Sequence, residues 1–171
     1  IGQRFDPLAK NGPPFLNNYH INMVHVSETG VYFSGLHSRA LLRLSSDMTI
    51  SQVCSLPEGV HNAQPFLDGI VFNDTKSDVV RFINRAGASK AFKVPAYNEE
   101  DLQFHGVDSS QVARQSFGRG LCVVNDQMVA AGSSPSTISL YDVQRGERIA
   151  VVSLTMDIRN AIHGLEVWPF D

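Results

Sequence analysis

The sequence predicts an all-β protein, a partial β-propeller with about three four-stranded blades plus one inner strand of a further blade. Short runs of Val, Ile, Phe, Leu and Tyr recur between clusters of Gly, Asn, Asp, Ser and Pro, while helical periodicity is nearly absent. These runs fall into sets of four. The sets repeat at intervals typical of propeller blades, with 41 residues from His20 to His61 and 44 from Arg119 to His163.

The first predicted blade spans residues 19–60 and follows an N-terminal connecting segment over 1–18. Its four apolar runs lie at 20–26, 30–35, 40–44 and 50–56. Turn-forming residues separate them, so neighbouring runs are expected to pair as hairpins.

The second predicted blade spans residues 61–96. Its runs lie at 61–68, 69–74, 78–84 and 89–95. A polar stretch over 97–118 follows and is predicted to be an insertion, with a short helix around residues 98–102.

The third predicted blade spans residues 119–156, with runs at 119–126, 127–134, 136–143 and 147–154. Its last two runs are joined by the glycine-containing turn "VQRGER" and resemble the outer hairpin of a blade. An alternative start is "FHGVD", because His105 lies 44 residues after His61. The start at "GRGLCVVND" is favoured since three well-formed strands follow it directly. The run "HGLEVWPF" within 163–171 is predicted to be the first strand of another blade.

Three blades and one strand do not close a ring, because propellers use four to eight blades. Other protein segments must pair with the open sheet edges and pack against the apolar blade faces. The remaining blades are therefore expected from the same polypeptide or from another chain, and the first residue, Ile1, favours a fragment, a cleaved product or a subunit. A β-sandwich or small barrel built from the same hairpins is the alternative fold.

Composition limits the classes of partner and compartment. The net charge of -3 favours neither a nucleic acid nor an anionic membrane as partner, and no apolar run is long enough to span a bilayer. Cys54 and Cys122 both lie in strand-like apolar runs, so they are interpreted as small buried hydrophobic residues rather than a disulfide framework. A reducing, cytoplasmic location is the resulting expectation.

Blade geometry places several polar residues on one face of the predicted propeller. The connection into each inner strand and the turn between a blade's second and third strands share that face. Four inner strands begin at His20, His61, Arg119 and His163. Asn22 and Asn62 accompany them near the channel, and His37, Asn73, Asp74, Ser133 and Ser134 lie farther out.

These residue types suggest ligand or metal chemistry at the channel mouth. Imidazoles bind transition metals or move protons, amide and carboxylate oxygens bind calcium, and a guanidinium pairs with a carboxylate or phosphate. The predicted catalytic residues are His61, His163 and Arg119. The predicted ligands of a divalent metal, calcium or a transition metal, are His20, His61, His163, Asn22, Asn73 and Asp74.

Structural roles are the alternative for each of these residues. A histidine at a strand start caps a turn or ties one blade to the next. Asn73 and Asp74 also suit a turn, and Arg119 suits an ion pair between blades.

Several catalytic and scaffold motifs are absent from the sequence. It has no G-x-S-x-G, H-E-x-x-H, C-x-x-C, P-loop or G-x-G-x-x-G motif. The WD and kelch signatures are also absent, so the common protein-scaffold propellers are not indicated.

The segments "SFGRGLCVVNDQMVAAGSS", "ISLYDVQRGE" and "HGLEVWPF" resemble the C-terminal half of a group of bacterial propeller-like proteins of uncharacterised activity. "YHINMVHV" and "GIVFNDTKSDVV" are similar to the earlier blades of that group. More remotely, the chain resembles six-bladed calcium-dependent lactonases and gluconolactonases. That resemblance implies a metal held at the channel by Asn22, Asn73, Asp74 and Glu166.

Two functions follow as expectations. In the first, the propeller binds a small ligand, with or without a metal, at a His-rich channel mouth. An enzyme of this kind is expected to be a metal-assisted, lactonase-like hydrolase, or a lyase or isomerase. In the second, the chain is a non-catalytic interaction module that completes a propeller with a partner chain.

Overall fold

The computed structural model describes residues 8, 10, 18–105 and 114–169. The described residues form twelve β-strands in three four-stranded antiparallel sheets, and each sheet keeps the order of the sequence. The fold is therefore all-β, as the spacing of the apolar runs predicts. Most of the predicted connecting segment over 1–18, and residues 106–113 of the predicted insertion, lie outside the described residues.

Each sheet corresponds to one predicted set of four runs. The first blade consists of β1 (Ile21–Ser27), β2 (Gly30–Gly35), β3 (Ala40–Leu44) and β4 (Ile50–Ser55). The second consists of β5 (Val60–Phe66), β6 (Gly69–Asp74), β7 (Val79–Asn84) and β8 (Ser89–Lys93). The third consists of β9 (Gly120–Val123), β10 (Met128–Ser133), β11 (Thr137–Asp142) and β12 (Glu147–Ser153).

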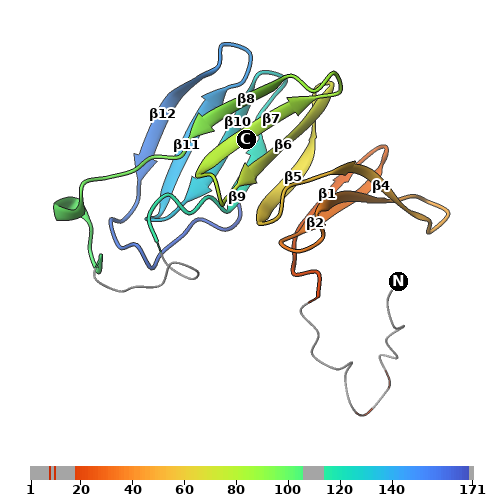
Figure 1. The fold of residues 1–171 in the computed structure, drawn as a ribbon, viewed down its shortest axis with the longest axis horizontal. Coiled ribbons are helices and arrows are strands. Elements are labelled where there is room, and N and C mark those ends of the chain that lie inside the picture. Colours follow the sequence, from red (N-terminus) through yellow and green to blue (C-terminus); the bar gives the residue numbers. More distant parts are fainter. Residues whose placement is uncertain (1–7, 9, 11–17, 106–113, 170–171) are drawn as a thin grey trace.

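The blades follow one another in space as they do in the chain (Figure 1). Strand β5 contacts β1 and β2, and β9 contacts β5 and β6. The first strands of successive blades are thus neighbours, which is the arrangement of inner strands around a propeller channel.

Two apolar cores hold the blades together, because each sheet buries one side of its pleat against the next sheet. The core between the first and second blades consists of Tyr32, Leu41, Leu56, Val60, Ala63 and Phe72. The core between the second and third blades consists of Phe66, Val71, Val80, Phe82, Phe92, Val94, Leu121, Val129, Ala131, Tyr141 and Val143. Two aromatic pairs reinforce the second core, with ring centroids 5.8 Å apart for Phe66 and Phe82 and 5.2 Å for Phe92 and Tyr141.

The outward face of the first blade is apolar but uncovered by the described residues. Strand register places Val24 opposite Phe33 and Val26 opposite Val31, with Leu42, Leu44 and Ile50 continuing the same face. Val24 is 63% exposed and Val26 is 72% exposed. The outward face of the third blade likewise carries Leu140 and the exposed Val152.

The segment after the third blade differs from its prediction. Residues 163–169 form no strand, although the pattern "HGLEVWPF" predicts one. The chain instead crosses the start of β9, where the Gly120 amide donates to the Ile162 carbonyl at 2.8 Å. A strand needs a neighbouring strand to pair with, and no described strand pairs with residues 163–169.

Two smaller expectations are confirmed. The third inner strand is the one that begins at Gly120, not the alternative at "FHGVD". The predicted short helix is the 3₁₀ turn η1 (Glu99–Asp101).

No helix among the described residues is long and apolar enough to cross a bilayer.

Candidate ligand site at the inner strands

Asparagine amides tie each inner strand to the next. The Asn22 side chain donates to the Val60 carbonyl at 3.1 Å, and the Asn62 side chain donates to the carbonyls of Arg119 and His163. Both asparagines lie at bulges, where the register of β1 and of β5 shifts. A bulge redirects a side chain out of the regular pleat, so the amide reaches the neighbouring blade.

His61 is buried, and its hydrogen bonds define its tautomer. Its Nδ1 lies 3.0 Å from Thr75 Oγ1, while the same hydroxyl donates to the Gly118 carbonyl at 2.9 Å. The hydroxyl has only one hydrogen, so Nδ1–H donates to it and Nε2 remains unprotonated. Burial, reinforced by the positive charge of Arg119, lowers the pKa of His61 to about 4. His61 is therefore neutral at pH 7.

Arg119 and His163 form the second part of the cluster. Arg119 Nη1 lies 3.0 Å from His163 Nε2, and the guanidinium lies 4.3 Å from the centroid of the Phe117 ring. Because a guanidinium only donates, Nε2 of His163 must be an unprotonated acceptor, which leaves Nδ1–H as its donor. Burial and the charge of Arg119 lower the pKa of His163.

The other predicted metal ligands have separate partners. The Asn73 amide donates to the Gly120 carbonyl at 2.9 Å, and Asp74 forms an ion pair with Arg81 at 2.9 Å. The His20 ring lies 6.3 Å from the His37 ring. Within the described part of the chain, no group of three or more His, Cys, Asp or Glu side chains is arranged to hold a metal ion. Asn73 and Asp74 are thus engaged by other side chains or backbone groups, and the metal site stays a prediction.

A groove of about 310 Å³ runs along the inner strands, and we call it the channel groove. It is lined by Asn22, Met23, Val24 and His25 of β1, Asn62 and Gln64 of β5, Leu121, Cys122 and Val123 of β9, and residues 163–166. Of the three predicted catalytic residues, His163 lines this groove. Arg119 and His61 are not lining residues, and Arg119 contacts the lining residue His163.

Three polar residues of the groove lining are not predicted from the sequence: His25, Gln64 and Cys122. They lie inside the inner strands, whereas the prediction concentrated on the strand starts. The alternation of side chains along a strand is the signal that would have found them, but the bulges in β1 and β5 shift that alternation. Burial, with the nearby charge of Glu166, raises the pKa of the Cys122 thiol, so this thiol stays neutral.

Comparisons with known proteins support the fold. No family model and no curated protein sequence matches the chain. The structure is similar to selenomethionine-substituted virginiamycin B lyase from Staphylococcus aureus, a β-propeller, with a TM-score of 0.51 and 12% identity. That alignment covers 81% of this chain and 43% of the lyase, so the chain spans less than half of that protein's length.

Two further solved structures have lower scores. A catalytically inactive variant of the Staphylococcus aureus lyase, with quinupristin, gives a TM-score of 0.40 at 15% identity and covers 74% of this chain and 42% of that chain. A streptogramin B lyase gives a TM-score of 0.41 at 14% identity, with the same coverage. These two alignments carry no argument. The likeness with a TM-score of 0.51, at 12% identity, concerns the fold alone and supports the propeller-like architecture.

Proposed function

We propose that this chain contributes three blades of a β-propeller that binds a small polar ligand in the channel groove. The observation that carries the proposal is the convergence of polar side chains from three inner strands on one cavity of about 310 Å³. Cavities of this size with a few convergent polar groups are typical of small-molecule sites.

The groove favours a ligand that carries hydroxyl and carbonyl groups. His163 offers Nδ1–H as a donor, because its Nε2 already accepts from Arg119. Glu166 offers carboxylate oxygens. Gln64 offers its amide oxygen, because its Nε2 donates to the Leu121 carbonyl at 3.4 Å. The lining thus includes both a donor and acceptors, as the recognition of a sugar-like or hydroxy-acid ligand requires.

The proposal gives His163 the acid–base role and Arg119 a positioning role. His163 lines the groove, is neutral and is oriented by the guanidinium. His61 has an indirect role, because Thr75 links it to the backbone at Gly118, next to Arg119. Any reaction at this site therefore depends on His163 more than on His61.

A metal is not required for this proposal. The guanidinium of Arg119 lies beside His163, and its positive charge opposes a divalent cation there. The metal remains a prediction from the sequence. Elemental analysis of the purified protein and of His163→Ala tests it, since a stoichiometric metal lost in the variant would support it.

The test is a binding titration with a panel of neutral sugars and hydroxy acids, followed by amide NMR. We expect at least one panel member to shift the amides of 120–123 and 163–166 in a saturable way. His163→Gln should weaken that binding by up to about tenfold, the value of one hydrogen bond. His37→Gln is the matched control, because His37 lies outside the groove lining. Equal weakening in both variants, or no saturable shift from the panel, would reject the proposal.

A second candidate function is an interaction module. The uncovered apolar faces of the first and third blades favour it, because such faces are normally buried against further blades. The partner would be further propeller blades, from the same polypeptide or another chain. We expect the isolated chain to self-associate or to capture such blades, and Val26→Lys to abolish this. A compact monomer by light scattering that binds no blade would contradict this candidate.

A further inference from the structure

A second cavity lies between the first and second blades and shares no residue with the channel groove. Its volume is about 380 Å³. It is lined by Tyr32, Val53, Cys54, Pro65, Leu67, Gly69, Ile70, Ile83, Asn84 and Arg85. Both walls belong to blades that are present in this chain, so the cavity does not depend on any further blade. We call it the interblade cleft.

Two local irregularities expose apolar side chains at this cleft. Val53 lies at the bulge in β4, between the partners of Leu41 and Leu42, and is 46% exposed. Leu67 has a φ of 51°, a left-handed conformation that is unfavourable for a bulky residue, and is 52% exposed. Strained backbone and exposed apolar surface each cost free energy, and their coincidence at one cavity indicates a binding surface.

The cleft carries a single charged lining residue, Arg85. Its backbone amide donates to the Asp68 carbonyl at 3.1 Å, which fixes the chain at the rim. Its guanidinium makes no ion pair with any carboxylate of the described residues. Burial raises the pKa of the Cys54 thiol, so that group stays neutral. The cleft therefore combines apolar walls with one positive charge.

We propose that the interblade cleft binds a small amphiphilic carboxylate, such as a medium-chain fatty acid. The hydrocarbon chain lies between Val53, Leu67 and Ile83, where its burial supplies the hydrophobic free energy. The carboxylate pairs with Arg85, whose planar guanidinium matches two carboxylate oxygens. The volume of the cleft is within the range of small-molecule sites.

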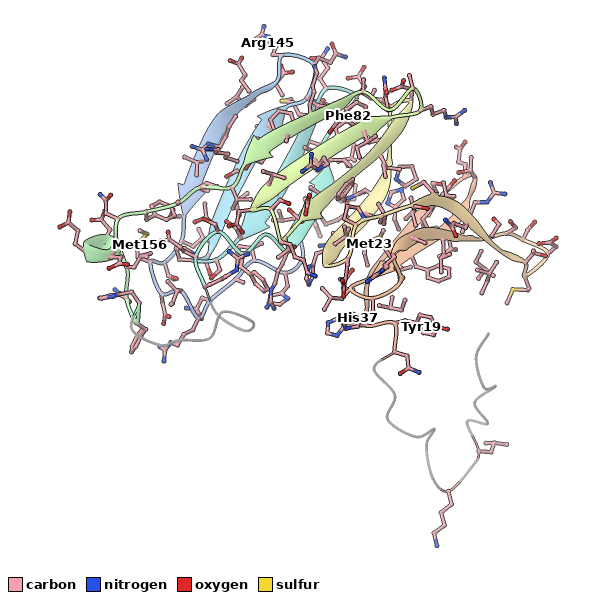
Figure 2. The ribbon with its side chains drawn as sticks, in the orientation of Figure 1. Tyr19, Met23, His37, Phe82, Arg145 and Met156 are labelled. Atoms are coloured by element: carbon pink, nitrogen blue, oxygen red, sulfur yellow. The ribbon has the colours of Figure 1, made fainter. Side chains whose placement is uncertain are left out.

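The test is a titration with octanoate, read from the methyl NMR signals of Ile70 and Ile83, with octanol and butyrate as comparison ligands. We expect octanoate to bind more tightly than either, because only octanoate has both the chain and the charge. Arg85→Gln should weaken octanoate about tenfold and leave octanol unchanged. Arg145→Gln is the control, since it removes the same charge from the turn between β11 and β12, outside the cleft lining (Figure 2). Arg145 pairs with Asp142 and Glu147, so melting temperatures are compared alongside.

The variant Leu67→Asn distinguishes a loss of ligand binding from a loss of folding stability. Asparagine tolerates the left-handed conformation, so this variant should keep or raise the melting temperature while weakening octanoate and octanol alike. Equal effects of Arg85→Gln and Arg145→Gln would overturn the proposal, as would octanol binding as tightly as octanoate. If a short acidic and apolar peptide binds more tightly than octanoate through Arg85, the small-molecule assignment is wrong.

Discussion

At the scale of single residues, asparagine rather than histidine ties the inner strands together. Asn22 and Asn62 both use the side-chain amide to reach a carbonyl of the next inner strand. Asparagine suits this place because its side chain is short and because it tolerates left-handed backbone, which Asn62 adopts with a φ of 51°. The histidines at the same strand starts make other contacts.

Replacing Asn62 with glycine should isolate the contribution of this tie. Glycine accepts the left-handed backbone but removes the amide that bonds the carbonyls of Arg119 and His163. We expect a loss of about 1 kcal/mol in the free energy of unfolding, because two partly buried carbonyls lose a donor. Urea unfolding measures it, and an unchanged midpoint would show that these carbonyls find another partner.

The low pKa of His61 should make stability depend on pH. Its ordinary pKa of 6.5 applies to the unfolded chain, whereas burial lowers the pKa to about 4 in the folded protein. Between pH 4 and pH 6.5 the unfolded chain binds more protons than the folded protein. The contribution of His61 to the free energy of unfolding is therefore fully present above pH 6.5 and is lost as the pH falls toward 4. The expected loss in the free energy of unfolding is up to about 3 kcal/mol.

Urea unfolding at several pH values between 4 and 7 tests this linkage. His61→Gln should flatten the dependence, while His105→Gln, a change at an exposed histidine, should leave it intact. A wild-type stability that is constant over this range would contradict the assigned burial of a neutral imidazole.

At the scale of elements, the segment after β12 is held by a close approach to the third blade. Ile162 lies against Gly120 and Gly132, and a Cβ on Gly132 would meet the Ile162 side chain at 2.5 Å. The absence of a side chain at both glycines lets the chain cross here and carry His163 to the groove. A pair of glycines thus positions one wall of the candidate site.

Gly132→Ala should therefore displace the crossing segment. We expect a loss of about 1–3 kcal/mol from overpacking, together with weaker ligand binding in the channel groove. Gly164→Ala is the matched control for stability, since a Cβ there meets no atom within 4 Å. Thermal unfolding and the amide NMR titration measure the two effects, and equal melting temperatures for both variants would contradict the close approach.

At the scale of the whole molecule, the two interfaces between blades differ in size. The core between the second and third blades contains many more buried apolar residues than the core between the first and second. The first blade also exposes its other apolar face. The free energy that holds the first blade to the others is therefore smaller.

Native-state hydrogen exchange should reveal this gradient. We expect the amides of β2 and β3 to exchange through openings of lower free energy than the amides of β6, β7, β10 and β11. Binding of further blades to the first blade should remove the difference. Uniform protection in the isolated chain would mean that the three blades unfold as one unit.

The strands, their grouping into blades and the all-β class can be predicted from the sequence alone. Apolar alternation and turn residues are local signals, and a repeat of 41 to 44 residues is visible without any structure. The meeting of Asn62, Arg119 and His163 also follows from the repeat, because equivalent positions of successive blades are neighbours in space.

Which polar groups share a cavity depends on tertiary packing. Two bulges decide whether His25 and Gln64 line the groove while His61 does not, because a one-residue shift moves a side chain to the other face. The failure of residues 163–169 to form a strand depends on neighbours that the local pattern does not encode. The interblade cleft depends on the packing of two sheets, so its walls come from residues distant in sequence. Periodicity is a property of each segment, whereas cavities and strand partners are properties of how segments pack.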